Sequence, residues 1–306
     1  MAISEEWAYL LDPGIRAIFE AQRDALAAQS VIPMLFNVSP SDKAVEYDLG
    51  VGGMEDFQVY EGRIEYDEPE ELWRPSYTHV EYTKGFKVER KLVDDDMYNV
   101  INQRPRALAL AAVRTREKSA ADIFNYAFTS SGHNGADGVS LCDGSHPYSP
   151  SNASVQDNEL AIALSYANVD TARQAMRAFK DDRGELISVN PRVLLVPPEL
   201  ENTAHEIVMT MRGPNSQQPS TANYAANLFQ DRGFSYVVWD YLTDANAWFL
   251  IDPDLAKLYL NWFDRVPLEI AMDPMSNYQL EARWRAYMRY SVGWSDWRWV
   301  VGCNPS

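Results

Sequence analysis

A long amphipathic pattern constrains the fold of this 306-residue chain more than any other feature of its sequence. From Pro105 to Phe128, apolar and small residues recur at intervals of three and four, so a helix would place them along one face. We therefore predict one long helix, the spine helix, which Pro105 either begins or kinks. The acidic run Asp94–Asp96 is expected to open a helix, because carboxylates favour the free N–H groups of a helix start.

A second pattern, alternation with period two, predicts a long β-hairpin over residues 56–92. Its strands would be Phe57–Tyr66 and Tyr77–Leu92, joined by a polar tip at residues 67–75. Gly85 interrupts the alternation and is expected to mark a β-bulge. An isolated two-stranded ribbon is marginal in water, so this hairpin needs a body to lie against, either its own or that of a neighbouring subunit.

The first 55 residues are interpreted as an arm. Helical spacing between residues 6 and 29 is interrupted by Asp12-Pro13-Gly14, which predicts two short helices. Residues 30–51 show no sustained period. The apolar residues of this region are too sparse for an independent core, so we expect the arm to pack on something else.

The rest of the chain mixes helices and strands without a regular β-α-β repeat, which indicates the α+β class. The predicted elements are a helix beginning at Asn168 or Asp170 and ending at residues 181–184, a buried strand at Arg192–Val196, a helix beginning at Pro197, strands at residues 234–239 and 246–251, and an extended segment at Trp284–Trp294. A long polar loop is predicted at residues 213–221.

The formal net charge of −17 narrows the classes of function. Such an acidic surface repels phosphate backbones, which argues against a classical DNA- or RNA-binding protein. Two cysteines rule out a disulfide framework and fit a reducing compartment. The N-terminus has no basic stretch followed by an apolar stretch, and no window approaches the length of a membrane span. We expect a soluble protein made in a cytoplasm, without a signal peptide.

Residues 137–154 are the segment most suggestive of chemistry, because Cys142 and His146 lie close to two aspartates. A structural zinc site needs four ligands, and Cys303 and the other histidines belong to unrelated elements. A cysteine nucleophile would need a base and an oxyanion donor, which spacing cannot supply. The Asp-Gly dipeptides favour a turn held by hydrogen bonds, with His146 as an anchor. No phosphate loop, dinucleotide fingerprint or nucleophile elbow occurs, so we expect a structural protein without a cofactor or metal rather than an enzyme.

Several motifs follow one another in an order that is typical of one family. They are G-F-K-V-E-R-x-x-V-D-D-D at Gly85–Asp96, D-G-x-x-L-x-x-x-x-H-P at Asp137–Pro147, D-x-x-G at Asp181–Gly184, P-x-x-L-L-V-P-P-E-L-E at Pro191–Glu201 and W-F-L-x-D at Trp248–Asp252. Together with the arm, the hairpin and the spine helix, they make the chain resemble the major capsid proteins of tailed bacteriophages, near the Mu-like major head subunits. The resemblance covers roughly residues 45–270.

This resemblance implies the Hong Kong 97-type capsid fold. Its parts would be an N-terminal arm at residues 1–55, an extended hairpin loop at 56–92, a peripheral domain with the spine helix at 93–165, an axial domain at 166–264 and a C-terminal segment at 265–306 that returns to the peripheral domain. The hairpin would lie across a neighbouring subunit. The residues expected to make that contact are Tyr60, Arg63, Tyr66, Trp73, Arg74, Tyr77, Tyr82 and Lys84.

The resemblance also implies a function. The protein would assemble with itself, through hexameric and pentameric capsomers, into the icosahedral head shell of a phage, and would enclose double-stranded DNA without sequence-specific binding. Separate scaffolding, portal and decoration proteins would be its partners, and it would reside in the virion capsid after assembly in the bacterial host cytoplasm. Two alternatives stay open: an encapsulin-like compartment shell, and a hydrolase or metalloenzyme that uses Cys142 and His146.

Overall fold

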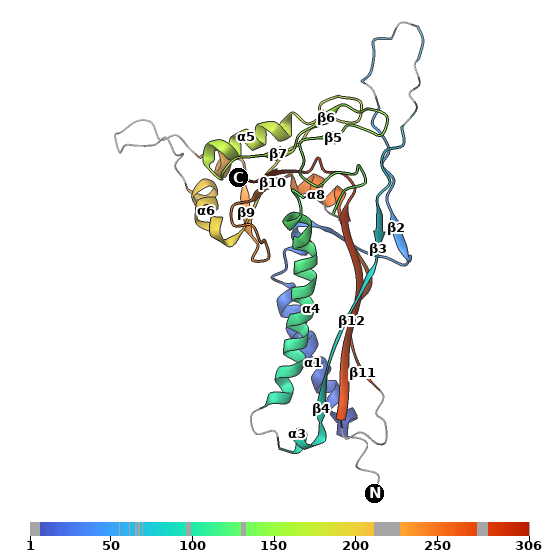
Figure 1. The fold of residues 1–306 in the computed structure, drawn as a ribbon, viewed down its shortest axis with the longest axis vertical. Coiled ribbons are helices and arrows are strands. Elements are labelled where there is room, and N and C mark those ends of the chain that lie inside the picture. The colour runs from blue at the N-terminus through green and yellow to red at the C-terminus, as the bar shows by residue number, and fades with distance from the viewer. Residues whose placement is uncertain are drawn as a thin grey trace, which may run out of the picture.

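The computed structural model describes residues 7–54, 56–60, 62–64, 66, 68, 70–95, 99–129, 133–210, 227–273 and 281–305. They form two halves, each built on its own sheet (Figure 1). The elongated half, which we call the shank, contains helices α1 (Trp7–Ala27) and α4 (Val100–Asn125) and a four-stranded sheet of β1 (Asn37–Pro40), β11 (Leu260–Met272), β12 (Glu281–Trp294) and β4 (Val80–Glu89), in that order.

The other half, which we call the crown, has a five-stranded sheet. In spatial order its strands are β7 (Glu159–Leu160), β13 (Val300–Cys303), β10 (Trp248–Ile251), β8 (Val193–Val196) and β9 (Ser235–Val238), accompanied by helices α5 (Tyr166–Arg177) and α6 (Glu201–Met209). The shorter elements are α2 (Ile32–Leu35), β2 (Val45–Tyr47), β3 (Ser76–Thr78), α3 (Arg90–Asp94), β5 (His146–Pro147), β6 (Val155–Gln156), η1 (Pro198–Leu200), α7 (Leu228–Asp231) and α8 (Pro253–Tyr259). This combination confirms the α+β class. Within the described ranges, no helix has the length and apolar character needed to cross a bilayer.

The predicted spine helix is confirmed as α4, which runs along the shank. Most of its predicted apolar stripe is buried, namely Leu108, Ala112, Ala120, Ile123, Phe124 and, just beyond its end, Ala127. The Arg116 guanidinium donates to both carboxylate oxygens of Asp264 on β11, at 2.8 and 2.9 Å. The same guanidinium lies over the Trp262 ring, 4.8 Å from its centroid. Helix and sheet are therefore joined by a charged contact as well as by apolar packing.

The start of α4 differs from the prediction. The helix begins at Val100 and continues through Pro105, which therefore lies inside it rather than in its first turn. Asp94 ends helix α3 instead of opening a helix, and Asp96 lies outside the described residues. A carboxylate is unfavourable at a helix end, but Arg90 lies one turn earlier with its Nε 3.9 Å from the Asp94 carboxylate, which offsets that cost.

Helix α1 is one continuous helix across Pro13, so the prediction of two short helices is wrong. The Asp12 carboxylate accepts hydrogen bonds from Arg16 Nε at 2.6 Å and from Trp284 Nε1 of β12 at 2.9 Å. Phe19, about two turns after Asp12, is fully buried. Packing along the shank therefore outweighs the local cost of the proline, which is about 3 kcal/mol in a helix interior.

The predicted hairpin is wrong in its pairing. Strand β4 pairs with β12, and none of the described residues between 57 and 66 belongs to a strand. A shorter hairpin exists earlier in the chain, where β2 pairs with β3. The alternation in β4 reflects its packing on β12 instead, because Tyr82 stacks on Tyr290 and Phe86 stacks on Trp284, with centroids 4.8 and 5.5 Å apart.

The irregularities of the shank sheet also lie elsewhere than predicted. The pairing of β4 with β12 continues without a shift through Gly85, so this glycine marks no bulge. A Cβ at Gly85 would lie 2.6 Å from the carbonyl oxygen of Trp284, so the glycine permits close approach of the two backbones. The register shifts occur in β11, between residues 264 and 269. These shifts surround Pro267 and interrupt the alternation of buried and exposed residues along β11, which explains why this strand was not predicted.

The crown follows the predictions closely. Strands β8 and β10 and helices α5 and α6 are confirmed. Helix α5 begins at Tyr166, slightly earlier than predicted, because the Ser165 hydroxyl accepts a hydrogen bond from the N–H of Asn168 and caps the helix. The predicted polar loop at residues 213–221 lies outside the described residues. The last strand, β13, pairs with β10, so residues 265–306 contribute to both halves.

Candidate subunit-interface site

The extended loop, which we define as residues 48–75, projects beyond the crown (Figure 1). Backbone hydrogen bonds between its two legs continue the β2–β3 ladder. Gly50 N–H donates to the carbonyl of Trp73 at 3.2 Å, and Gly52 N–H donates to the carbonyl of Glu70 at 2.8 Å. The loop therefore leaves the body as an ordered two-stranded ribbon.

The base of the extended loop is fixed to the turn Asp181–Gly184. Gly53 N–H donates to Asp182 Oδ1 at 3.0 Å. A Cβ on Gly52 would lie 2.5 Å from Asp182 Oδ2, so glycine is needed for the ribbon to pass this close. The turn is itself held by Asp181 Oδ1, which accepts two backbone N–H groups. The D-x-x-G motif thus anchors the loop, a role that its sequence did not reveal.

The tip of the extended loop exposes large apolar side chains. They are Phe57, Val59, Tyr60, Ile64 and Tyr66, of which Phe57 is fully exposed and Tyr66 is 89% exposed. Single exposed apolar residues are ordinary, but five within ten residues make the tip a candidate interaction site. Residues 55–71 also contain eight acidic residues and one arginine, so the tip combines apolar and negative character.

The structure separates the eight predicted contact residues into two groups. Tyr60, Arg63 and Tyr66 are exposed at the tip, and Arg74 is exposed near the base, 4.7 Å above the Tyr47 ring; Trp73 is half-buried there. Lys84 is exposed on β4, in the shank.

Tyr77 and Tyr82 are poorly suited to contact a neighbour. Tyr77 is buried within its own subunit, and burial raises its pKa to about 12. Its ring packs on Phe263, with centroids 5.2 Å apart. Tyr82 is half-buried and stacked on Tyr290. Tyr77 lies in β3, which pairs with β2, and Tyr82 lies in β4, which pairs with β12. Both rings are nevertheless covered by strands of the shank sheet, Tyr77 by β11 and Tyr82 by β12.

The Cys142 and His146 segment is a structural turn. His146 is fully buried, its Nδ1 lies 2.6 Å from Asp137 Oδ2, and its ring stacks on Trp297 with centroids 4.4 Å apart. Burial raises the pKa of the Cys142 thiol well above its usual value, so the thiol stays neutral and unreactive. In the described part of the chain, no three His, Cys, Asp or Glu side chains are placed to hold a metal ion. The geometry argues against a hydrolase or metalloenzyme that uses this pair.

A buried carboxylate joins three parts of the molecule. Glu117 of α4 is 6% exposed, and its Oε2 accepts a hydrogen bond from Trp239 Nε1, after strand β9, at 2.9 Å. Its Oε1 accepts a hydrogen bond from the hydroxyl of Ser30, which follows α1. The sequence analysis missed this junction. Its one signal is that an acid occupies the buried face of the spine helix, three residues before Ala120.

Comparisons with known proteins agree with this architecture. The sequence model of the family described as phage capsid protein matches residues 74–302. No curated protein sequence matches the chain.

Solved capsid structures share the fold. One capsid chain of bacteriophage JBD30 has a TM-score of 0.56 and 16% identity, with 70% of this chain and 91% of that chain covered. The mature capsid of bacteriophage PhiM1 gives a TM-score of 0.56 and 12% identity, covering 90% and 86%. A virus-like particle from Pyrococcus furiosus gives 0.53 and 11%, covering 95% and 98%. The chain belongs to the phage capsid protein family, and it is a structural major capsid protein with the Hong Kong 97-type fold.

Proposed function

We propose that this protein forms the icosahedral head shell of a tailed phage by assembling into hexameric and pentameric capsomers. The shell encloses double-stranded DNA without reading its sequence, and it assembles in the cytoplasm of a bacterial host with scaffolding, portal and decoration proteins as partners. The protein performs no catalysis. The matched family, which is one of phage capsids, favours this function over an encapsulin-like compartment.

The two halves of the structure correspond to the two domains expected for this fold. We assign the shank to the peripheral domain, because its helix α4 falls within the range 93–165 expected for that domain, and the crown to the axial domain, because most of its elements fall within 166–264. Every strand of the shank sheet lies outside 93–165, and the crown strands β7 and β13 lie outside 166–264. Residues 1–55 form the arm, and residues 265–306 complete both sheets. Closed shells need contacts that repeat between identical subunits, and long projecting elements spread those contacts over several neighbours.

The observation that carries this proposal, beside the family match, is the extended loop. Its base is tied to the body by the Gly53–Asp182 hydrogen bond, whereas its tip presents apolar side chains to solvent. A monomeric protein gains nothing from an ordered ribbon that exposes Phe57 and Tyr66. A subunit that buries this tip on a neighbour gains roughly 25 cal/mol for each Å² of apolar surface covered.

The test is electron microscopy of the purified protein, alone and with the scaffolding protein co-expressed. We expect closed shells from the wild type. A variant in which residues 56–66 are replaced by a Gly-Ser linker should keep the circular dichroism and thermal unfolding of the wild-type protomer but form no shells. A wild-type protein that stays monomeric or dimeric under both conditions would contradict the proposal.

A further inference from the structure

A hollow in the shank lies where the segment from α1 to β1 meets helix α4 and strand β11. Its volume is about 350 Å³, which is within the range of small-molecule sites. Most of its wall is apolar, and the apolar residues come from the α1–β1 segment and from α4 and β11. They include Ala27, Ile32, Pro33, Val38, Val113 and Leu268. We call this space the Glu117 hollow, because the carboxylate of Glu117 also forms part of its wall.

The carboxylate of Glu117 is buried without a counter-charge. The residue is 6% exposed, and it forms no ion pair with any residue that the structure describes. Its Oε2 accepts a hydrogen bond from Trp239 Nε1 at 2.9 Å, and its Oε1 accepts one from the Ser30 hydroxyl. An ionised carboxylate has about four lone-pair sites, so these two bonds leave acceptor capacity unused. A buried charge is costly unless a partner of opposite charge compensates it.

The other charged groups of the Glu117 hollow are already paired. Arg116 donates to both carboxylate oxygens of Asp264, at 2.8 and 2.9 Å. Arg23 donates from its Nε to Asp24 Oδ1 at 2.9 Å. The charge that stays uncompensated in the wall is therefore the negative charge of Glu117, which favours a cationic ligand.

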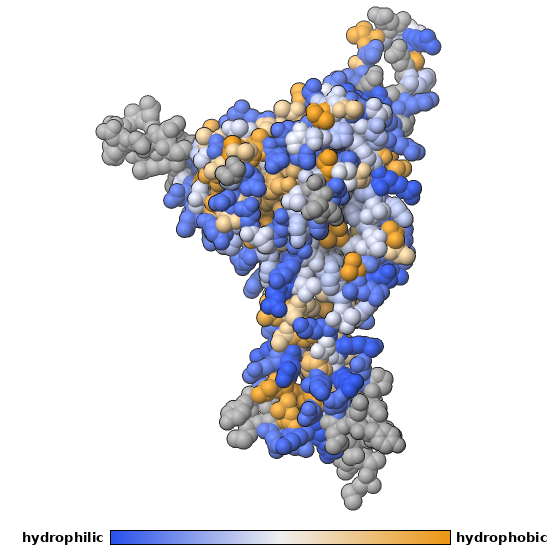
Figure 2. Space-filling model, in the orientation of Figure 1, coloured by the Kyte–Doolittle hydropathy of each residue, from blue (hydrophilic) through white to orange (hydrophobic). Residues whose placement is uncertain are grey.

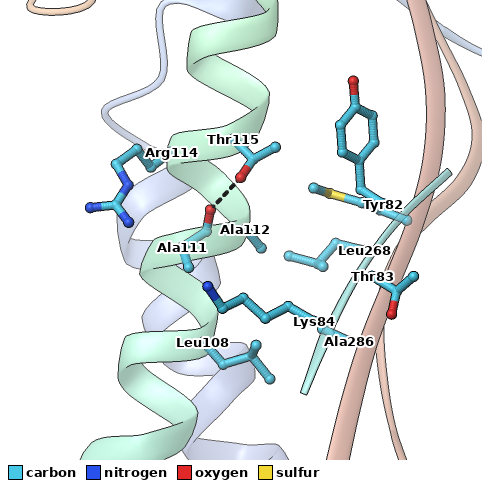
Figure 3. A pocket seen from close by; sticks show the side chains of 11 residues that line it. Tyr82, Thr83, Lys84, Leu108, Ala111, Ala112, Arg114, Thr115, Leu268 and Ala286 are labelled. Carbon is cyan, nitrogen blue, oxygen red and sulfur yellow. Dashed lines mark hydrogen bonds between the residues drawn. The ribbon is translucent and has the colours of Figure 1, made fainter. Parts of the chain in front are cut away.

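A second cavity of the shank shows the contrast. It lies between α4 and the sheet, has a volume of about 160 Å³, and Lys84 reaches across it toward α4 (Figure 3). No carboxylate is among the described residues that line it. On the face that Figure 2 shows, hydrophilic and hydrophobic side chains are interspersed over the shank, so apolar surface alone does not distinguish a site. The buried acid distinguishes the Glu117 hollow.

Two other buried carboxylates have compensation that Glu117 lacks. Glu46 is paired with Lys43, whose Nζ lies 2.9 Å from its Oε2. Asp252 caps helix α8, where its Oδ1 accepts the N–H groups of Asp254 and Leu255 and benefits from the positive end of the helix dipole. Glu117 lies in the middle of α4 and gains nothing from a helix end.

We propose that the Glu117 hollow binds a primary alkylammonium group with a chain of about four to six carbons. The ammonium group would donate to the free lone pairs of Glu117, and the chain would lie against the apolar wall. A metal ion is a poorer match, because the wall is mostly apolar and hard cations take six or more oxygen ligands. The site does not depend on shell assembly, so this inference goes beyond the proposed function.

Binding to the unassembled protomer tests the site, with butylammonium chloride as the probe. At roughly ten times its Kd, the probe should raise the thermal unfolding midpoint by about 3 °C, because it binds only the folded chain. Sodium chloride at the same concentration controls for ionic strength, and 1-butanol controls for the apolar chain. A shift as large with either control would overturn the proposal.

Glu117→Gln removes the charge and keeps an acceptor at the same place. Calorimetry should show butylammonium binding about tenfold weaker than in the wild type, since the charge-assisted hydrogen bond is lost. A Glu117→Gln variant that binds the probe as tightly as the wild type would overturn the role of the carboxylate.

A second variant tests the hollow without changing the buried acid. Val38 lines the hollow from β1 and is 43% exposed, so Val38→Phe should fold and fill the space. We expect it to abolish measurable binding of butylammonium. Met34→Phe is the matched control, because Met34 is similarly exposed on α2 but does not line the hollow. Unchanged binding in Val38→Phe would place the probe elsewhere and overturn the proposal.

A free amine and a lysine side chain of a second copy supply the same chemical group. Calorimetry on assembled particles distinguishes these sources. Particles that bind butylammonium as the protomer does would assign the hollow to a free amine. Particles that no longer bind it, while the unassembled protomer does, would assign it to a lysine supplied within the shell. Both results keep the ammonium site, whereas a protomer that binds no butylammonium overturns it.

Discussion

Strand β12 and the tip of the extended loop show similar alternation of apolar residues with opposite outcomes. In β12 every second side chain is buried, namely Ala282, Trp284, Ala286, Met288 and Tyr290. In the loop, Phe57, Val59, Ile64 and Tyr66 are exposed. The alternation thus predicts that one face requires burial, but it does not say which chain supplies the partner. The buried face of β12 is covered within the chain, where Trp284 Nε1 donates to Asp12 of α1 and the Tyr290 hydroxyl lies 2.8 Å from that of Ser119 on α4. The four side chains of the loop stay exposed in the described part of the chain, as the proposed function requires.

The largest expected effect separates these two regions directly. Trp284→Ala should destabilise the protomer by about 3–5 kcal/mol, because it empties a fully buried aromatic site and removes the hydrogen bond to Asp12. Phe57→Ala should change protomer stability by no more than about 0.5 kcal/mol. Urea unfolding followed by tryptophan fluorescence measures both. Equal destabilisation by the two variants would mean that the loop packs on its own subunit.

The next effect concerns the junction that holds the shank and crown together. Glu117→Ala should destabilise the protomer by about 1–3 kcal/mol, since it leaves buried Trp239 Nε1 without its acceptor. Glu117→Gln is the matched control, because its amide oxygen keeps one acceptor at the same place. The thermal unfolding midpoint should be highest for the wild type, lower for Glu117→Gln and lowest for Glu117→Ala. An Ala variant as stable as the wild type would contradict the structural role of this carboxylate.

A smaller effect is expected at the base of the loop. Gly52→Ala adds a Cβ that meets Asp182 Oδ2, so the ribbon should shift away from its anchor at a cost of about 1 kcal/mol or less to the protomer. Limited proteolysis should then cut the loop faster, and shell yield should fall. Gly62→Ala, at the tip, is a comparison with open space around the new methyl group, although its positive φ of 92° adds local strain. Equal proteolysis of Gly52→Ala and wild type would show that the anchor does not limit the loop.

The smallest effect is a pH dependence within the shank. His79 is buried between two hydroxyls, with Ser41 Oγ 3.1 Å from its Nε2 and Ser291 Oγ 3.0 Å from its Nδ1. Burial, followed by the positive charge of Arg289, lowers the pKa of His79 below 6.5, and Glu46 only partly opposes this.

The unfolded chain therefore binds a proton on this histidine at a higher pH than the folded chain does. Stability from His79 is fully present above about pH 6.5 and is lost as the pH falls through the lower folded pKa. The urea midpoint should thus decline more steeply on acidification in the wild type than in His79→Gln. Parallel declines in the two proteins would assign the acid sensitivity to other groups.

The sequence was most informative where a residue's partners lie close along the chain or where the burial pattern is continuous. Helix α4 and strand β8 were predicted because their apolar periodicity is unbroken. The pairing of β4 was not predictable, since its partner β12 lies about two hundred residues later and both face the same core. The sequence predicted two helices in place of α1, with a break at Pro13, because the hydrogen bond between Asp12 and Trp284 joins residues far apart in the chain and leaves no local pattern.

The interface residues stay a prediction. The need of an isolated ribbon for an external body drew attention to Tyr60 and Tyr66, whose side chains are exposed. Tyr77 and Tyr82 were included because the sequence could not separate the loop from the strand that follows it. Their burial depends on contacts with Phe263 of β11 and Tyr290 of β12, which lie about two hundred residues later in the chain.

The anchored base of the extended loop also affects how a shell can form. A free segment of this length would lose much of its conformational entropy when it docks, and each residue fixed costs about 1–2 kcal/mol. Here the hydrogen bonds from Gly50, Gly52 and Gly53 order the ribbon while the protomer folds. Docking of the loop on a neighbour, as proposed, then has less conformational entropy to lose, and after one contact has formed the next one forms at a high effective concentration. Each weak contact can therefore remain reversible while subunits are still finding their places, and the closed shell gains its permanence from the number of such contacts.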